Sequence, residues 1–202
     1  MPTTTAWLLD KYPSVYHVTY TSNLPGIRLN GFRSANALKR LARSASGFRA
    51  ESAPLFRKGL GYATLRDQGR MPPKSLRECL PINLSTDDWY QLVDDHIFFF
   101  FDEQKAEELF EKYIKLAPQS LLAAQTRDVL SAVGPSVRLT PINTGAVGRA
   151  RAKRDADTFH PLDKWIREGF TDRIRTRPKA PVELAVRLDS LRIDFSVRDS
   201  RP

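Results

Sequence analysis

The stretch that decides the fold is Val15-Tyr16-His17-Val18-Thr19-Tyr20, which has the residue types and the alternation of a β-strand. Successive side chains of a strand point to opposite faces, so Tyr16, Val18 and Tyr20 share one face, and His17 and Thr19 share the other. Two hydrogen-bonding groups therefore lie side by side. This pair is typical of a ligand cradle, although a structural role for His17 inside the fold explains the same pattern.

The residues that follow this strand favour a short helix over residues 23–29. Thr21 or Ser22 can cap the helix, and Pro25 falls in its first turn, where a missing N–H group costs little. Gly31 can take the left-handed conformation after the helix end. A polar strand that runs directly into a helix N-terminus strengthens the prediction of a ligand cradle.

The remaining pattern predicts one α+β domain over residues 1–202. Ile97-Phe98-Phe99-Phe100-Phe101 is typical of a central strand buried on both faces, and Asp102 can cap the helix after it. A late strand, Pro181–Val186, carries a lone carboxylate at Glu183. Other helices are expected over residues 7–11, 35–45, 74–80, 86–93 and 127–132, other strands near 62–65 and over 120–125 and 136–140, and a helical turn at 190–193 before a short closing strand.

Composition narrows the class of protein. Cys79 is the single cysteine, so no internal disulfide is expected, and one cysteine with three scattered histidines predicts no metal site. The first ten residues lack the pattern of a secretory signal, and no apolar run approaches the length of a membrane span, which predicts a cytoplasmic protein without membrane contact. The basic segment near residues 148–157 lacks apolar periodicity and is expected to be a mobile loop.

Positive charge is concentrated in the first third of the chain. The net charge is +9, and residues 28–77 contain twelve Lys and Arg against two acids. Residues 85–116 are acidic instead, with nine acids against three bases. Basic clusters suit phosphate contacts, so a nucleic acid, DNA or RNA, is the expected macromolecular partner. Arginine-rich surfaces that are simply solvated remain the alternative.

The order His17, Thr19 and Asn23, followed by Gly31-Phe32, resembles the opening of ADP-ribosyltransferase-fold proteins, and most closely the DarT family of DNA ADP-ribosylating toxins. Val182-Glu183-Leu184-Ala185-Val186, with Leu191-Arg192-Ile193 after it, resembles the strand that carries the catalytic glutamate in that family. The resemblance implies an ADP-ribosyltransferase-like split mixed β-sheet with flanking helices. It also implies NAD as a substrate.

The same resemblance implies roles for individual residues. His17 and Thr19, with Asn23 beside them, would bind the nicotinamide and ribose of NAD, and Glu183 would be catalytic. A fixed carboxylate can stabilise the positive charge that builds on the ribose when the glycosidic bond breaks. An ion pair between Glu183 and one of the many arginines is the alternative.

An arginine for the NAD phosphates is expected at Arg66, because it follows an expected strand and a guanidinium can bind a diphosphate in bidentate fashion. Arg33 and Arg154 are rivals for this role. Asn143 and Thr144 can line the same pocket or merely close a turn. Residues 159–180 correspond best to the substrate-binding loop of the DarT family.

The function expected from these features is NAD-dependent ADP-ribosyl transfer, a glycosyltransferase reaction, to nucleic acid by a bacterial toxin or phage-defence factor. Two alternatives stay open: a non-catalytic nucleic-acid-binding module on the same fold, and an NAD-dependent RNA 2′-phosphotransferase. The whole chain also resembles an uncharacterised bacterial family through motifs such as Pro141-Ile142-Asn143-Thr144-Gly145. The sequence leaves the acceptor, an antitoxin partner and the oligomeric state open.

Overall fold

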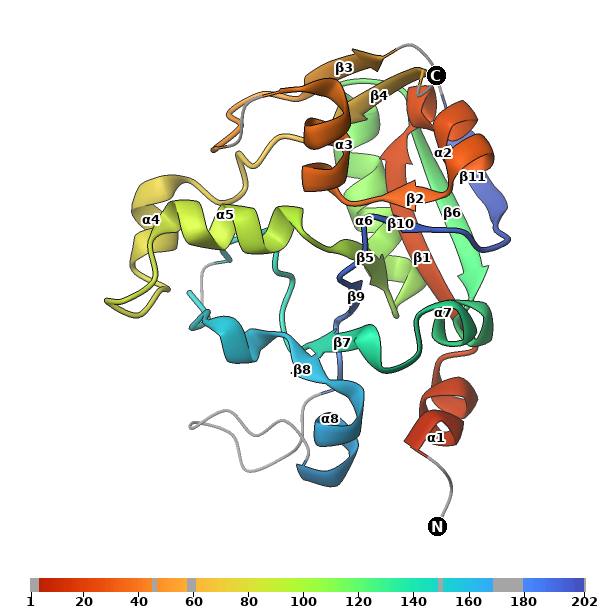
Figure 1. The fold of residues 1–202 in the computed structure, drawn as a ribbon, viewed down its shortest axis with the longest axis vertical. Coiled ribbons are helices and arrows are strands. Elements are labelled where there is room, and N and C mark those ends of the chain that lie inside the picture. Colours follow the sequence, from red (N-terminus) through yellow and green to blue (C-terminus); the bar gives the residue numbers. More distant parts are fainter. Residues whose placement is uncertain (1–3, 45–46, 58–60, 149–150, 169–179, 202) are drawn as a thin grey trace.

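A seven-stranded sheet forms the centre of the fold in the part of the chain that the structure describes (Figure 1). The structure is a computed structural model, and it describes residues 4–44, 47–57, 61–148, 151–168 and 180–201. In spatial order the strands are β11 (Ser196–Arg201), β6 (Gln119–Gln125), β1 (Ser14–Tyr20), β5 (Ile97–Phe100), β9 (Glu183–Val186), β7 (Val137–Thr140) and β8 (His160–Pro161).

Two small sheets and a set of helices surround this sheet. One small sheet pairs β2 (Phe32–Arg33) with β10 (Ser190–Leu191), and the other is a hairpin of β3 (Ala53–Arg57) and β4 (Gly61–Leu65). The helices are α1 (Thr4–Lys11), α2 (Leu24–Asn30), α3 (Ala35–Ala42), α4 (Pro73–Arg77), α5 (Thr86–Asp94), α6 (Glu103–Ile114), α7 (Thr126–Val133) and α8 (Leu162–Glu168), with short 3-10 turns η1 (Thr21–Asn23), η2 (Gly134–Ser136) and η3 (Ala156–Thr158).

The α+β class expected from the sequence is confirmed, but the sheet is not mixed. Every pairing among the described strands is antiparallel. The physical reason lies in the position of β1. The two strands that α6 connects, β5 and β6, both run antiparallel to β1, but β1 lies between them, so these two parallel strands never pair with each other.

Each face of the sheet is covered by different elements. Helix α6 packs against β1 and β6, where Val18, Phe100 and Leu121 meet Ala106 and Phe110 of the helix. On the other face α7 and the β2–β10 pair cover a larger apolar cluster that includes Val15, Phe32, Phe99, Leu122 and Val129. A third cluster joins α4 and α5 around Trp89. Alternation along the strands accounts for this division, since neighbouring residues face opposite layers.

The sheet opens between β1 and β5. Their pairing consists of Tyr16 and Phe100 alone, whereas β1 pairs with β6 along its whole length. At the next position the His17 ring replaces the missing backbone partner, because its Nδ1 lies 2.8 Å from the carbonyl oxygen of Phe98. Beyond the Tyr16–Phe100 pair the two strands therefore diverge and leave space between them.

Several local predictions need correction. No side chain caps the helix after β1, because the turn η1 occupies the expected cap positions Thr21 and Ser22. Ser85 caps α5 instead of Thr86, since its hydroxyl accepts from the backbone N–H of Asp88 while the Asp88 carboxylate accepts from the Ser85 N–H. Residues 190 and 191 pair with β2 rather than form a helical turn.

Gly31 is required where β2 and β10 meet. Its φ of +80° is a conformation that other residues adopt at a cost. A Cβ atom at this position would lie 2.5 Å from the carbonyl oxygen of Leu191. The glycine therefore permits both the turn after α2 and the close approach of β10.

Candidate functional site

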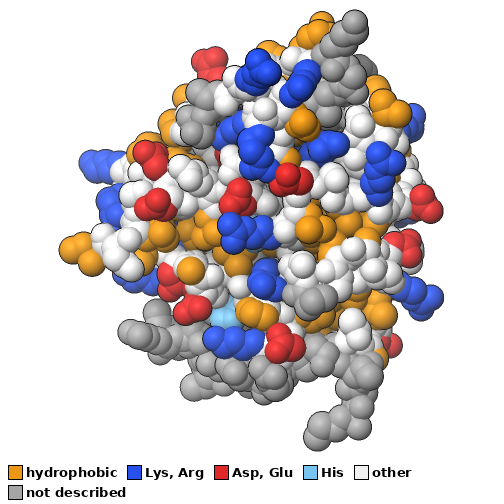
Figure 2. Space-filling view, in the orientation of Figure 1, with side chains coloured by type: hydrophobic (Ala, Val, Ile, Leu, Met, Phe, Trp, Pro, Cys, Tyr) orange, Lys and Arg blue, Asp and Glu red, His pale blue; other side chains and the backbone are white. Residues whose placement is uncertain are grey.

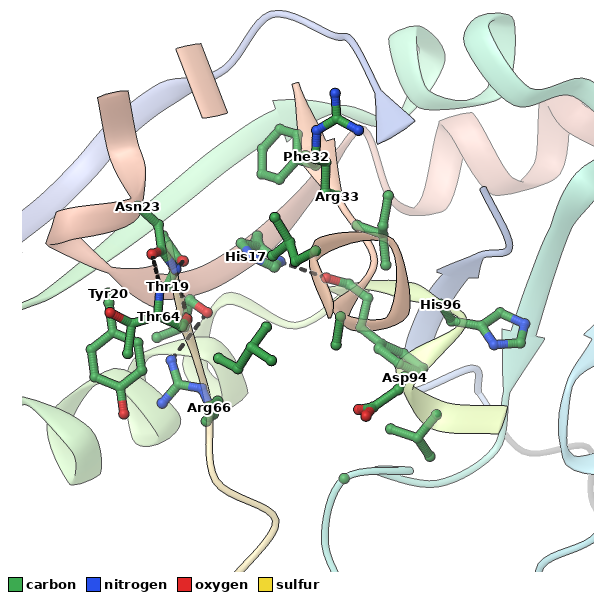
Figure 3. A pocket seen from close by; sticks show the side chains of 18 of the residues that line it. His17, Thr19, Tyr20, Asn23, Phe32, Arg33, Thr64, Arg66, Asp94 and His96 are labelled. Atoms are coloured by element: carbon green, nitrogen blue, oxygen red, sulfur yellow. Dashed lines mark hydrogen bonds between the residues drawn. The ribbon is translucent and has the colours of Figure 1, made fainter. Parts of the chain in front are cut away.

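One pocket collects all of the site residues expected from the sequence. It has a volume of about 270 Å³ and lies where β1 and β5 diverge, with residues of β4 in its lining. Figure 3 shows His17, Thr19, Asn23 and Arg66 among the side chains around it. Its lining includes the seven residues His17, Thr19, Asn23, Arg66, Asn143, Thr144 and Glu183. Residues more than 160 positions apart in the chain thus meet at one cavity.

His17 is a neutral imidazole with one defined hydrogen bond. Since a carbonyl oxygen only accepts, the Nδ1 atom carries the proton that it donates to Phe98, and Nε2 is left as an acceptor. The pKa of His17 is lowered to about 4, mainly by burial and in part by the positive charge of Arg66, while the hydrogen bond to Phe98 opposes this shift. The ring packs edge-on against Phe32. At neutral pH this residue can accept a hydrogen bond but carries no charge.

Asn23 connects β1 to the hairpin. Its Nδ2 atom donates to the Thr19 hydroxyl and to the carbonyl oxygen of Thr64, both at 3.0 Å, and its Oδ1 accepts from the Thr64 N–H at 2.6 Å. Both amide donors are occupied, so Asn23 acts on the pocket chiefly by positioning β4 and Thr19. The Thr19 hydroxyl accepts from Asn23 and keeps its own proton to donate. Binding of a cofactor by Asn23 stays a prediction.

Arg66 lies between two aromatic rings at the end of β4. Its guanidinium carbon is 4.1 Å from the Tyr113 ring centre and 5.2 Å from that of Tyr20. The Nη2 atom donates to the carbonyl of Val18 at 3.2 Å and to Gln119 at 2.8 Å. The buried Nη1 atom has no hydrogen-bond partner among the described residues. Burial also lowers the pKa of Arg66, so a negatively charged ligand would relieve an unfavourable state.

Glu183 is buried and held through one of its two oxygens. Oε2 accepts from the Thr140 hydroxyl at 3.1 Å, from the Thr144 backbone N–H at 3.0 Å and from the Thr144 hydroxyl at 2.9 Å. No described residue donates to Oε1. The turn after β7 therefore fixes the carboxylate and leaves one oxygen for a ligand in the pocket.

Glu183 has no cation within ion-pair distance among the described residues, so the alternative of an ion pair is not observed. Burial raises its pKa to about 7, while the hydrogen bonds from Thr144 and Thr140 and the more distant charge of Arg154 oppose this rise. Near neutral pH the group divides between a carboxylic acid and a carboxylate. A carboxyl group in this state can act as an acid, as a base or as an acceptor for a hydroxyl.

Arg154 holds the loop that follows β7 and is not among the residues that line the pocket. The side chain is 2% exposed, and it donates to the backbone carbonyls of Asn143, Ala146 and Ala152. Two of these three bonds hold the turn around Thr144, and the buried Nε atom has no hydrogen-bond partner among the described residues. Phosphate binding by Arg154, the rival of Arg66, stays a prediction. The described part of the segment near 148–157 is thus anchored at this residue.

Strand register places the site residues on both faces of the sheet. Tyr16 pairs with Phe100, which pairs with Glu183, so these three residues share a face. His17 and Thr19 lie on the opposite face of β1. All of them still line one pocket, because β1 and β5 diverge beyond the Tyr16–Phe100 pair and the cavity reaches through the opening.

A family model matches residues 13–194 of the chain. The chain belongs to the DUF7002 family. This family is described as one of unknown function. No curated protein and no solved structure matches the chain significantly. The matched region contains every pocket residue from His17 to Glu183, so the pocket lies within the part of the chain that the family model covers.

Sequence reasoning missed a buried charge cluster that borders the pocket. Asp94, at the end of α5, accepts from Lys39 at 2.5 Å, from both terminal nitrogens of Arg49 at 2.6 and 2.9 Å, and from Gln68 at 3.2 Å. Asp94 and Lys39 are almost fully buried. Two cations surround one carboxylate, so the cluster leaves net positive charge beside the cavity. The helical periodicity of α3 gives no signal for this cluster, because Lys39 falls outside the apolar stripe formed by Leu38, Leu41 and Ala42.

Four arginines and three acids contribute to the pocket lining. The arginines are Arg33, Arg49, Arg66 and Arg70, and the acids are Asp67, Asp94 and Glu183. Arg33 resembles Arg66 in having a buried nitrogen, Nε, without a hydrogen-bond partner among the described residues. Apolar side chains from β2, α3 and β5 complete the walls, among them Phe32, Leu38 and Phe98.

Part of the expected site lies outside the described residues. The expected substrate-binding loop spans residues 159–180, and residues 169–179 of it are not described. Residues 149 and 150 of the basic segment, Arg149 and Ala150, are not described either. Within the described ranges no helix is long and apolar enough to cross a membrane, and no group of three His, Cys, Asp or Glu side chains is arranged as a metal site.

Proposed function

We propose that this protein is an NAD-dependent ADP-ribosyltransferase, a glycosyltransferase that modifies nucleic acid. The observation that carries the proposal is the meeting of His17, Arg66 and Glu183 at one cavity in the opening of the sheet. The opening of the sheet and the helices that flank it fit part of the ADP-ribosyltransferase-like fold implied by the sequence resemblance, whereas the all-antiparallel strands depart from the mixed sheet of that fold. A bacterial toxin or phage-defence role, with an antitoxin as partner, belongs to the same proposal.

The polar groups of the pocket suit the parts of NAD. The neutral His17 ring offers Nε2 as an acceptor for the nicotinamide carboxamide, and the Thr19 hydroxyl offers a donor beside it. Arg66 has a buried, unpartnered Nη1 atom, which suits a phosphate oxygen. Its Nη2 bonds to the β1 backbone and to Gln119 hold the guanidinium in place before the phosphate arrives.

Glu183 supplies the chemistry of the proposed reaction. Breakage of the bond between nicotinamide and ribose builds positive charge on the ribose ring. In its ionised form, Oε1 of Glu183 accepts a hydrogen bond from a ribose hydroxyl and stabilises that charge at close range. The nicotinamide leaves with the bonding electrons, the nucleic-acid nucleophile attacks the ribose carbon, and the proton of the nucleophile passes to a base.

The reaction rate is expected to rise with pH around neutrality. The pKa of Glu183 is raised to about 7, so only a fraction of the molecules carries the reactive carboxylate below that pH. His17 stays neutral over the same range, because its pKa is lowered to about 4. The ionisation of Glu183 therefore determines this limb of the pH profile.

The proposal is tested by nicotinamide release from NAD by the purified protein, with and without single-stranded DNA or RNA. The wild type should release nicotinamide and transfer a mass-detectable ADP-ribose to one of the two polymers. Glu183→Gln should bind NAD with similar affinity in calorimetry but release no nicotinamide. Glu108→Gln, which changes an exposed carboxylate of α6, is the matched control and should retain full activity.

Either of two results would refute the proposal: no binding of NAD by the wild type, or full turnover by Glu183→Gln. In a bacterial host, expression of the wild type but not of Glu183→Gln should arrest growth if the protein acts as a toxin. Binding of nucleic acid without any binding of NAD would instead support the alternative of a non-catalytic nucleic-acid-binding module.

The four arginines at the pocket favour one second candidate, an NAD-dependent RNA 2′-phosphotransferase. Such an enzyme needs several basic side chains around an RNA phosphate, and Arg33, Arg49, Arg66 and Arg70 all line the cavity. An RNA oligonucleotide with one internal 2′-phosphate distinguishes the two reactions. NAD-dependent loss of that phosphate supports the second candidate, and stable ADP-ribose on an unphosphorylated polymer supports the first.

A further inference from the structure

The hairpin of β3 and β4 presents an aromatic surface to solvent. Leu55 and Ala63 point inward and are 8% exposed each, whereas Phe56 and Tyr62 are 61% and 66% exposed. These two aromatic residues pair directly across the hairpin, with ring centres 4.7 Å apart and planes tilted by 43°. The two rings therefore support each other while much of their surface remains open.

An exposed aromatic pair of this kind needs a reason, because large apolar side chains in contact on a surface favour association. Nothing in the core requires them, since the inward face of the hairpin is already filled by Leu55, Ala63 and Leu65. Aromatic side chains on a strand face are the usual platform on which unpaired nucleic-acid bases stack. Stacking is independent of base identity because every base has a π-face.

The charge around the hairpin suits a polyanion. Helix α3 packs against β3 and ends at the exposed Arg43, while its Arg40 pairs with Asp189. Arg57 follows Phe56 on β3, is exposed and donates to the carbonyl oxygen of Leu41 in α3. Glu51 and Asp67 are the acids that flank the hairpin in the sequence, and residues 28–77 as a whole contain twelve basic residues against these two acids. Figure 2 shows Lys and Arg side chains gathered over the upper part of the molecule, where Figure 1 draws the hairpin and α3.

The aromatic surface is continuous with the pocket. Tyr62 and Thr64 both line the pocket, and Arg66 follows on the same segment. Asn23 holds this segment against the end of β1 through its two bonds to the Thr64 backbone. A strand bound on the hairpin would thus place its next nucleotide at the mouth of the cavity that contains Glu183.

We infer that the outer face of the hairpin is the binding surface for a single-stranded nucleic acid, whose bases stack on Phe56 and Tyr62 while basic side chains beside the hairpin, such as the exposed Arg43, contact its phosphates. This inference rests on the proposed function for the identity of the acceptor. It adds the requirement that the acceptor be unpaired at this point, because the faces of bases in a duplex are already stacked on one another.

Fluorescence anisotropy with labelled oligonucleotides tests the inference. The probes are a deoxythymidine oligomer, a uridine oligomer and a DNA duplex of the same length, all at low salt, since phosphate contacts weaken as salt rises. The wild type should bind both single strands more tightly than the duplex. Phe56→Ala should weaken single-strand binding by about fivefold or more, the loss typical of one stacked base.

Two further variants guard against trivial explanations. Phe56→Trp keeps a stacking surface and should bind single strands as tightly as the wild type. If substitution at this position weakened binding only by disrupting the hairpin, the tryptophan variant would bind weakly too. Ile82→Ala removes the most exposed large apolar residue of the described chain, 99% exposed and outside the pocket lining, and should change nothing. Phe56→Ala should also keep wild-type nicotinamide release without acceptor, because Phe56 does not line the pocket.

The inference is overturned if Phe56→Ala binds single strands as well as the wild type, if tryptophan does not restore binding, or if no oligonucleotide binds. Its failure can be told from failure of the proposed function. If single-strand binding depends on Phe56 but the protein does not turn over NAD, the hairpin surface is supported and the proposed enzyme activity is refuted. If the protein turns over NAD but Phe56→Ala does not weaken nucleic-acid binding, the enzyme activity is supported and the hairpin surface is refuted.

Discussion

Replacing Glu183 with glutamine should stabilise the folded protein above neutral pH, even though the side chain accepts three hydrogen bonds. The glutamine carbonyl can accept the same bonds from Thr140 and Thr144, and its amide nitrogen takes the position of Oε1, to which no described residue donates. The substitution thus removes a buried negative charge and keeps the bonds that hold the group in place.

The size of the effect follows from the pKa of Glu183. This pKa is about 7 in the folded protein against an ordinary value of 4.5, a difference of about 2.5 pH units that corresponds to about 3 kcal/mol. Between these two values the folded state binds the proton and the unfolded state does not. The contribution of Glu183 to stability therefore falls as pH rises from about 4.5 to about 7 and is constant above.

Urea denaturation of the wild type and Glu183→Gln at about pH 4 and about pH 8 measures this difference. The two proteins should be nearly equal at the lower pH, and the variant should be more stable at the higher pH by about 3 kcal/mol. Other titrating groups, including His17 and His96, are present in both proteins, so their contributions cancel. A variant that is less stable at the higher pH, or a gap that does not change with pH, would refute the reasoning.

Three other expectations concern stability and local motion. Burial lowers the pKa of His96 to about 4, so the contribution of this residue to folding stability is lost as pH falls from about 6.5 towards 4. In His96→Gln the midpoint of urea denaturation should therefore fall less steeply with acid than in the wild type. An unchanged dependence on pH would count against this expectation. Asp94→Asn should lower the free energy of unfolding by about 3–5 kcal/mol in urea denaturation, because it leaves two buried cations with one neutral partner. The change Asp189→Asn, at an exposed ion pair, is the control and should have little effect. Equal losses of stability in the two variants would contradict the role of the buried cluster. Asn23→Ala should speed amide hydrogen exchange at Thr64 more than in β5 or β6, and uniform acceleration would show that the asparagine does not act locally.

The sequence predicts the local elements well where a periodic pattern stands alone. The alternation in residues 15–20 and the phenylalanine run at 97–101 correspond to β1 and β5, and most expected helices are found within a few residues of their bounds. The sequence does not predict strand β3, because this strand contains Pro54 and a single buried residue, Leu55, and so shows no alternation of apolar and polar residues. The antiparallel direction of the sheet depends on which strands become neighbours, and local patterns do not record that.

The candidate site is likewise only partly predictable from the sequence. His17, Thr19 and Glu183 stand out as polar residues on strands, so their presence at a cavity was predictable. What surrounds them was not, because the partners are distant in sequence: Thr144 bonds to Glu183 across 39 residues, and Lys39 bonds to Asp94 across 55. A turn pattern at Asn143-Thr144 could be recognised, but the burial of a carboxylate beneath it could not.

The attachment of Glu183 through one oxygen has a consequence for ligand entry. An arriving hydroxyl or amide can bond to the free oxygen without displacing Thr140 or Thr144, so no internal bond has to break first. Little free energy is then spent on rearranging the protein, and more of the interaction with the ligand remains as affinity or as rate. For the proposed reaction, this part of the pocket therefore needs no rearrangement before a ligand binds.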